Sequence, residues 1–217
     1  MLKYGKFTVR ELRPIRDAMT VSRSAEMGER TKVTFFSLGK DTSISQESYD
    51  DAVLYVGAAG SGYAVCGEEK KKEKIEPGNA VYVPNGKLCG FDGGEGVIYT
   101  EIILKGNHEM NEKIKAGEAF KLKDLISYEE GSIANLDVVK GNGMKYVLMA
   151  FDEGTGLTPH RAPGNAIVFA LEGKATIGYE GKDYELSEGE CFRFEKNGLH
   201  SVTANGRFKM ALLLVIE

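Results

Sequence analysis

The sequence predicts an all-β protein made of two similar halves in tandem. Short apolar runs such as KVTFFSL, GVIYTEIIL and MALLLVI are rich in the β-branched and aromatic residues that favour strands. Gly, Asp and Asn groups bound most of these runs, and the chain holds 27 glycines but only 5 prolines. The length of 217 residues suits two domains of about 100 residues each. Many short strands at regular spacing are typical of a sandwich or a barrel.

The evidence for two halves is an internal repeat made of two aligned blocks. In the first block, three pairs of residues lie 114 apart: Gln46 and His160, Ala52 and Ala166, Ala59 and Gly173. In the second block, two pairs lie 111 apart: Gly78 and Gly189, Cys89 and His200. The repeat predicts an N-terminal domain over 1–106, a linker over 107–118 and a C-terminal domain over 119–217.

Charge and hydropathy argue against several classes of protein. The net charge of −4 and the dispersed Lys and Arg residues argue against a nucleic-acid-binding face. The one basic run, Lys70–Lys74, contains Glu73 and is flanked by acidic residues, so we interpret it as a solvated hairpin tip. The sequence contains no apolar segment typical of a signal peptide or long enough to span a bilayer.

The cysteines indicate a reducing environment. Cys66, Cys89 and Cys191 are odd in number and widely spaced, and no CxxC pair occurs. This pattern favours free thiols over a disulfide framework. With no targeting segment expected, it predicts a cytoplasmic protein.

The C-terminal half resembles the cupin superfamily, whose first motif is GxxxxxHxHxxx(x)ExxxxxxG. Gly154 and Gly173 stand at the two glycine positions of this motif. His160 holds the first histidine position, whereas Ala162 and Ala166 stand where the second histidine and the glutamate belong. The string HRAPGNAIVFALEG is similar to a subset of cupins of largely uncharacterised function, in which alanine replaces that glutamate.

The second cupin motif, GxxxxxPxGxxHxxxN, fits both halves in different ways. In the C-terminal half, Gly189 and His200 are in frame, while Glu195 and Asn197 replace the proline and the second glycine. In the N-terminal half, the first glycine, the proline, the second glycine and the histidine correspond to Gly78, Pro84, Gly86 and Cys89. Each half therefore keeps a part of the motif that the other has lost.

The first motif of the N-terminal half has lost its metal-binding residues. Gln46, Ser48 and Ala52 stand where the family has two histidines and a glutamate. We interpret Gln46, Ser48 and Cys89 as the remains of a lost site, and Cys89 as a small buried thiol in the place of a ligand.

The resemblance implies two tandem antiparallel jelly-roll β-barrels. In this family three histidines and one carboxylate in the barrel mouth bind a transition metal such as Fe, Mn, Ni, Zn or Cu. His160 and His200 are therefore candidate metal ligands, but they form an incomplete set. The alternative is that both imidazoles act as hydrogen-bonding or acid–base groups in a metal-free pocket.

Residues that share the strand parity of His160 are expected to face the barrel interior. Ala162, Ala166 and Val168 share that parity, and they predict a small-walled apolar pocket with room for a ligand. Cys191, on the strand that opens the second motif, is a further candidate for the pocket wall.

Two functions remain open on the sequence. The first is a bicupin that binds a small molecule in its C-terminal barrel, with its metal site partly lost. The second is a metal-dependent cupin enzyme of isomerase, lyase, hydrolase or dioxygenase type, with His160 and His200 as metal ligands. The missing carboxylate favours the first. The expected partners are a small-molecule ligand and, if the protein is a homodimer rather than a monomer, a second copy.

Overall fold

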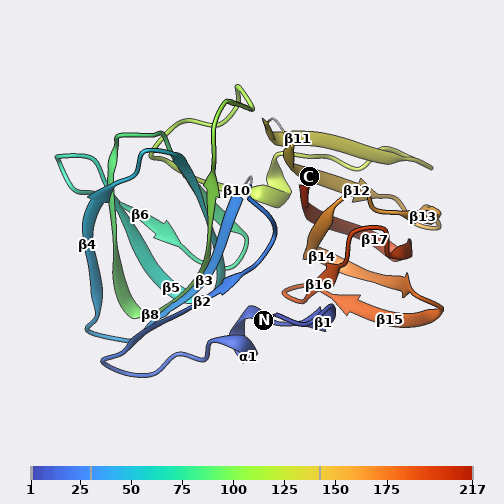
Figure 1. Ribbon diagram of the computed structural model, residues 1–217, viewed down its shortest axis with the longest axis horizontal. Helices are drawn as coiled ribbons and strands as arrows, with labels where there is room; N and C mark the ends of the chain where they lie inside the picture. The colour runs from blue at the N-terminus through green and yellow to red at the C-terminus, as the bar shows by residue number, and fades with distance from the viewer. Residues whose placement is uncertain (1, 30, 142, 217) are drawn as a thin grey trace. The chain divides into compact units, whose positions relative to one another are not determined.

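The computed structural model describes residues 2–29, 31–141 and 143–216, which form two compact units (Figure 1). The N-terminal barrel comprises Val9–Lys121, and the C-terminal barrel comprises Leu122–Glu217 together with an arm, Met1–Thr8. Each unit is built almost wholly from antiparallel strands, which confirms the predicted all-β fold of two jelly-roll barrels in tandem. Among the described residues, no helix has the length and apolar character needed to cross a membrane.

In the N-terminal barrel, two long strands each pair with several neighbours. Its elements are α1 (Val9–Leu12), β2 (Thr20–Ala25), β3 (Thr31–Leu38), β4 (Ser43–Ser48), β5 (Ala52–Cys66), β6 (Lys71–Ile75), β7 (Asn79–Val83), β8 (Leu88–Leu104), β9 (His108–Met110) and β10 (Ala119–Lys121). The main strand order is β10-β7-β5-β8-β3-β2, while β4 pairs with β8 and β6 with β5. The core includes the rings of Phe91 and Tyr99, which stack with centroids 3.9 Å apart.

The C-terminal barrel repeats this topology strand for strand. Its elements are β1 (Gly5–Phe7), η1 (Leu122–Asp124), β11 (Ile133–Gly141), β12 (Met144–Phe151), β13 (Gly156–Arg161), β14 (Asn165–Tyr179), β15 (Lys182–Ser187), β16 (Cys191–Phe194) and β17 (Leu199–Val215). The order is β1-β16-β14-β17-β12-β11, with β13 on β17 and β15 on β14. Because every strand has a counterpart in the N-terminal barrel, the repeat in the sequence is also a repeat in structure.

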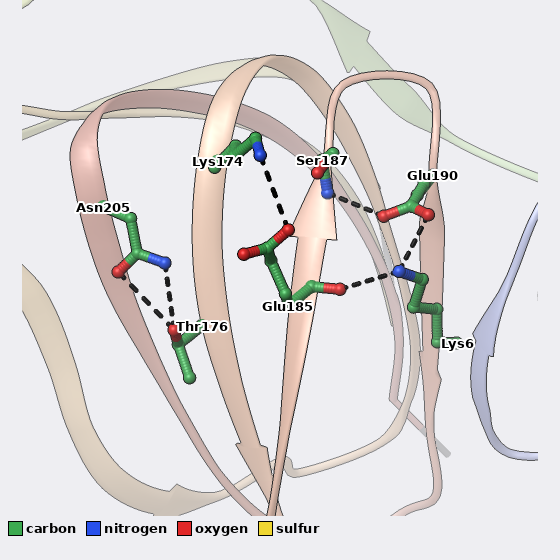
Figure 2. Close-up of polar contacts among 7 residues, drawn as sticks. All are labelled: Lys6, Lys174, Thr176, Glu185, Ser187, Glu190 and Asn205. Carbon is green, nitrogen blue, oxygen red and sulfur yellow. Dashed lines mark hydrogen bonds and ion pairs between the residues drawn. The ribbon is translucent and has the colours of Figure 1, made fainter.

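The arm supplies an edge strand to the C-terminal barrel. β1 pairs antiparallel with β16, with Phe7 opposite Cys191. Figure 2 shows the Lys6 ammonium donating to the backbone oxygen of Glu185 and pairing with the Glu190 carboxylate, each at 2.8 Å. The arm is therefore held by backbone pairing and by one partly exposed ion pair.

The arm also covers a buried cation. The side chain of Arg193 on β16 is only 2% exposed. Its guanidinium donates to the backbone oxygen of Leu2 and lies 4.8 Å from the ring centroid of Tyr4. A buried charge is costly unless it is hydrogen-bonded, so the arm stabilises the barrel partly by providing contacts for this side chain.

We predict that deleting residues 1–7 destabilises the C-terminal barrel by about 3–5 kcal/mol, because the deletion removes partners of the buried Arg193 guanidinium. The free energy of unfolding, followed by circular dichroism in urea, measures the effect. Lys6→Ala is the matched control. It breaks only the partly exposed ion pair and is expected to cost less than about 1 kcal/mol. Equal losses in the two variants would contradict the role given to Arg193.

The two compact units differ from the ranges 1–106, 107–118 and 119–217 predicted from the repeat. The arm belongs to the C-terminal barrel, and β10 joins the N-terminal barrel by pairing with β7, with Phe120 opposite Ala80. The pair Phe120–Ala80 corresponds to Phe7–Cys191, because 120 − 7 is 113 and 191 − 80 is 111. Each repeat thus gives its first strand to the other repeat's barrel, an exchange that sequence similarity does not reveal.

Strand register corrects the alignment of the first repeat block by one residue. Val53 lies opposite Ile103 in the N-terminal barrel, and Ala166 lies opposite Leu214 in the C-terminal barrel. Ile103 and Leu214 are 111 apart, as the second block requires, so the counterpart of Ala166 is Val53 and the offset is 113. The predicted counterpart, Ala52, is one residue too early. The identity of Ala52 and Ala166 had favoured an offset of 114, but the backbone pairing shows that the equivalent residue is Val53.

In the corrected alignment two glycines are equivalent, and each allows the long strands of its own barrel to approach closely. Gly60 has a φ of +69°, and a Cβ built there would lie 2.1 Å from the backbone oxygen of Gly96. Gly173, 113 residues later, has a φ of +75°, and its Cβ would lie 2.1 Å from the backbone oxygen of Arg207. The predicted counterpart of Gly173 was Ala59, which cannot be equivalent because it carries a Cβ. Only glycine combines this left-handed backbone with this contact.

We predict that Gly60→Ala and Gly173→Ala each destabilise their barrel by about 3 kcal/mol or more, because a methyl group must displace a neighbouring backbone carbonyl. The matched controls are Gly78→Ala and Gly189→Ala. These positions also have positive φ, +79° and +83°, but nothing lies within 4 Å of a built Cβ. The controls are expected to cost only about 1–2 kcal/mol. Thermal unfolding of the four variants makes the comparison, and losses of equal size would contradict it.

Candidate functional site

The structure brings the two predicted histidines together at the mouth of the C-terminal barrel. His160 near the end of β13 and His200 near the start of β17 are directly paired across the strands. Their ring centroids lie 4.2 Å apart, with an angle of 52° between the planes. His160 is exposed, while His200 is half-buried.

The backbone fixes the tautomer of both rings. Nδ1 of His160 lies 2.8 Å from the oxygen of Thr158, and Nδ1 of His200 lies 3.1 Å from the oxygen of Gly198. A carbonyl oxygen can only accept, so each Nδ1 carries a proton and donates it. In the neutral ring the lone pair is then on Nε2, and the described part of the chain provides no hydrogen bond to either Nε2. Two acceptors cannot bond to one another, so the pair is suited to a donor or a cation from outside.

His108 in the N-terminal barrel shows the same backbone arrangement with a satisfied ring. Its Nδ1 lies 3.2 Å from the oxygen of Gly106. Its Nε2 accepts from the hydroxyl of Tyr82 at 3.1 Å. The contrast makes His108 a natural control for the pair at the C-terminal mouth.

Aromatic rings flank the histidine pair. Phe194 lies with its centroid 4.4 Å from that of His200. Tyr179 is the cross-strand partner of His200 and meets Phe194 edge-on at 5.6 Å. Phe192 continues the cluster, 4.7 Å from Phe194. The histidines therefore lie beside a cluster of aromatic side chains, in which Phe192 and Phe194 are buried and Tyr179 is partly exposed.

The predicted pocket residues face the interior, but aromatic side chains pack against them. Ala162 is buried, and Ala166 and Val168 belong to the apolar core of the barrel. Ala166 is directly opposite Phe194, and side chains at such positions lie on the same face. The ring of Phe194 therefore lies where the sequence predicted free space for a ligand.

Cys191 does not lie with these interior residues. Cys191 directly precedes Phe192 on β16, and the side chains of Phe192 and Phe194 belong to the interior core. Its side chain therefore points to the opposite face of the strand. The thiol is buried there, and burial raises its pKa. The prediction of Cys191 as a pocket-wall residue beside the histidines is corrected by this alternation.

Register also corrects the predicted remains of a site in the N-terminal barrel. Glu47 on β4 is paired with Cys89 on β8, as His160 is with His200. The counterpart of His160 is therefore Glu47 rather than Gln46, with an offset of 113 (160 − 47). The error has the same origin as in the first repeat block, since that whole block was aligned one residue too early.

Gln46 and Ser48 have other surroundings. The Gln46 side-chain amide donates to the backbone oxygens of Val65 and Gly67, at 3.1 and 2.8 Å, and so fastens β4 to the end of β5. Ser48 is exposed. Cys89 is buried, as predicted. Gln46 thus has a structural role at the barrel mouth.

Two residues at the barrel mouths were not singled out from the sequence. Tyr179 is the cross-strand partner of His200, and Cys66 is the cross-strand partner of Cys89. Both residues end a long strand just before a hairpin turn. That position is visible in the sequence, but the partner on the other long strand depends on bulges that the sequence does not mark.

The residues at the C-terminal mouth do not match the full metal-binding set of cupins. His160 and His200 provide two nitrogen ligands, while Ala162 and Ala166 provide none. Among the described residues, no group of three or more His, Cys, Asp or Glu side chains is placed to hold a metal ion.

The comparisons with known proteins agree with this architecture. A family model for the cupin domain matches residues 147–216, which include both histidines. The chain is similar to the Cupin 2 conserved barrel domain protein from Leptotrichia buccalis, with a TM-score of 0.86 and 25% identity over 99% of this chain and 98% of that one. A comparison with curated protein sequences gave no match.

Two further solved structures share the fold at low sequence identity. Salicylate 1,2-dioxygenase from Pseudaminobacter salicylatoxidans has a TM-score of 0.63 and 10% identity, over 86% of this chain and 71% of that one. AerE from Microcystis aeruginosa has a TM-score of 0.54 and 14% identity, over 91% and 98%. The fold defines a protein of two jelly-roll barrels. With the family match, the C-terminal barrel holds a cupin domain over residues 147–216, and the chain as a whole has the fold of a two-barrel cupin.

The environment of His200 gives a pH-dependent prediction. Burial lowers the pKa of this imidazole below its ordinary value of 6.5, and charge on His160 lowers it further, while the bond to the Gly198 oxygen opposes both effects. The unfolded chain then binds protons more readily than the folded one as the pH falls below 6.5.

We predict that His200 makes the free energy of unfolding decrease as the pH falls from 6.5 towards the pKa of this imidazole in the folded protein, which is lower. NMR titration of the chelator-treated protein measures the pKa, and urea unfolding across this range measures the stability. His200→Ala is expected to reduce the pH dependence. A His200 pKa at or above 6.5 would refute the prediction.

Proposed function

We propose that the C-terminal barrel binds a small molecule at its mouth, with His160 and His200 accepting hydrogen bonds from it. The observation that carries the proposal is the pair of free Nε2 acceptors on adjacent rings whose Nδ1 atoms are already fixed by the backbone. A ligand with two neighbouring donors satisfies both atoms at once. Binding costs little conformational entropy of the protein, because both imidazole rings are already oriented.

The surroundings of the pair favour a particular kind of ligand. Tyr179, which is partly buried, is the cross-strand partner of His200 and presents aromatic surface there, while Phe194 packs against the His200 ring from within the core and is only 1% exposed. Such surface suits the apolar body of a ligand, while a few polar groups fix its orientation. We therefore propose a small hydroxylated molecule with an aromatic or other apolar body. The similarity to salicylate 1,2-dioxygenase shows the fold alone and does not define the substrate.

A second candidate function is the binding of one divalent transition metal by the same two Nε2 atoms. The anchored Nδ1–H groups favour it, because metal-binding histidines usually donate their other nitrogen to a carbonyl or carboxylate. Water or a bound ligand would complete the coordination. A metal with free positions would add Lewis-acid chemistry and support an enzymatic role.

We also propose that the protein resides in the cytoplasm and takes a small-molecule ligand, as a monomer or a homodimer. The three cysteines are free, which fits a reducing compartment.

We predict that ligands which stabilise the wild type do not stabilise the double variant His160→Ala/His200→Ala. A thermal-shift screen of catechols, hydroxy acids and sugars identifies such ligands. At about 100 times the dissociation constant, a ligand stabilises by about 2.7 kcal/mol. His108→Ala is the matched control and should keep the full shift. Stabilisation that persists in the double variant would place the ligand elsewhere and contradict the proposal.

Elemental analysis of the same three proteins distinguishes the two candidate functions. Near-stoichiometric metal in the wild type and in His108→Ala, with none in the double variant, would support the metal site. No metal after reconstitution with Fe, Mn, Ni, Zn or Cu would reject it and leave ligand binding by the imidazoles alone.

A further inference from the structure

The N-terminal barrel holds two thiols in contact at its mouth. Cys66 at the end of β5 and Cys89 near the start of β8 are directly paired across the strands. Their Sγ atoms lie 3.3 Å apart. Directly paired residues in antiparallel strands have Cα atoms about 4.5–5.5 Å apart, which falls within the range that a disulfide spans. Joining the two sulfurs therefore requires little movement of the backbone.

A cavity of about 350 Å³ gives access to one of the two thiols. Cys66 lines it, together with the turn that follows β5, Pro84 and Lys87 of the next turn, and the segment 116–117. Cys66 is largely buried, at 8% exposed, but it lines the cavity, whereas Cys89 does not line it and is only 2% exposed. A molecule in the cavity can therefore reach Cys66 directly, and Cys89 only through Cys66.

Cys66, the thiol that lines the cavity, also has the lower pKa of the two. A hydrogen bond from the Cys89 thiol lowers the pKa of Cys66, and the charge of Lys71 lowers it further, against the effects of burial and Glu73. The same bond and burial raise the pKa of Cys89. Because the thiolate is the nucleophile in thiol chemistry, the accessible Cys66 is the attacking group.

This thiol pair occupies the same place as part of the candidate site in the other barrel. Cys66 corresponds to Tyr179, with an offset of 113, and Cys89 corresponds to His200, with an offset of 111. Both pairs join the end of one long strand to the start of the other. The two barrels thus present different chemistry at equivalent positions.

We propose that Cys66 and Cys89 form a dithiol site that is oxidised reversibly by a small organic disulfide entering this cavity. The Cys66 thiolate attacks one sulfur of the disulfide R–S–S–R, forms a Cys66–S–S–R bond and releases RS⁻. The Cys89 sulfur then attacks Cys66, releases a second RS⁻ and gives up its proton to a released thiolate. The proton that the Cys66 thiol lost to solvent on ionising returns to the other released thiolate. The two protein thiols thus lose two electrons, and the disulfide gains them and becomes two thiol molecules.

The test uses the whole protein and bis(hydroxyethyl) disulfide, a small neutral probe. Intact-mass and peptide analysis after quenching with N-ethylmaleimide identifies the products. We expect the wild type to lose two hydrogen atoms and to form a Cys66–Cys89 cross-link, while Cys191 stays free. We expect Cys66 to react at least about tenfold faster than Cys191, because Cys191 is buried with a raised pKa.

Single variants separate the two steps. Cys89→Ser is expected to stop at a stable mixed disulfide on Cys66, and Cys66→Ser to leave Cys89 unmodified. Cys191→Ser is the matched control and should form the cross-link at the wild-type rate. Circular dichroism confirms that each variant is folded.

Three outcomes would overturn the proposal: no reaction at Cys66, a wild-type mixed disulfide that does not resolve, or equal reaction of all three thiols. Cys89→Ala is a second variant in case Cys89→Ser does not fold. The result is independent of the function proposed for the C-terminal barrel, because His160 and His200 take no part in it.

Discussion

The long strands of each barrel depend on a close backbone crossing at equivalent positions, in which a glycine of one strand lies against a carbonyl oxygen of the other. In the N-terminal barrel Gly60 meets Gly96, and in the C-terminal barrel Gly173 meets Arg207. Register shifts flank both crossings, so the strands bend there and exchange one set of neighbours for another. The bend allows β5, β8, β14 and β17 each to serve both halves of a jelly roll. The mouths that carry the candidate sites form beyond these bends.

The two barrels have kept this backbone constraint while their mouths have diverged. The pairing of strands is equivalent throughout, with offsets of 113 and 111. At the equivalent cross-strand position, one barrel has Tyr179 and His200 and the other has Cys66 and Cys89. Interior packing and the left-handed backbone restrict the glycines at the crossings, whereas the cross-strand pairs at the mouths differ completely in side-chain chemistry.

Much of the fold could be predicted from the sequence, because strand patterns, turns and the repeat all point to two β-barrels. The pairing of His160 with His200 also followed from the spacing of two motifs. Three features could not be predicted. The one-residue shift that makes Glu47 equivalent to His160 depends on bulges. The outward direction of Cys191 depends on which face of a short strand meets the core, and the ring of Phe194 beside Ala166 depends on cross-strand pairing.

The exchanged first strands have a consequence for the order of folding during synthesis. Residues 9–121 include every strand of the N-terminal barrel, so this barrel can close as soon as β10 has left the ribosome. The arm is made before this barrel, but its partner β16 is made after it. The arm must therefore remain unpaired while a whole barrel is made and closes, and it reaches its place only when the second barrel forms.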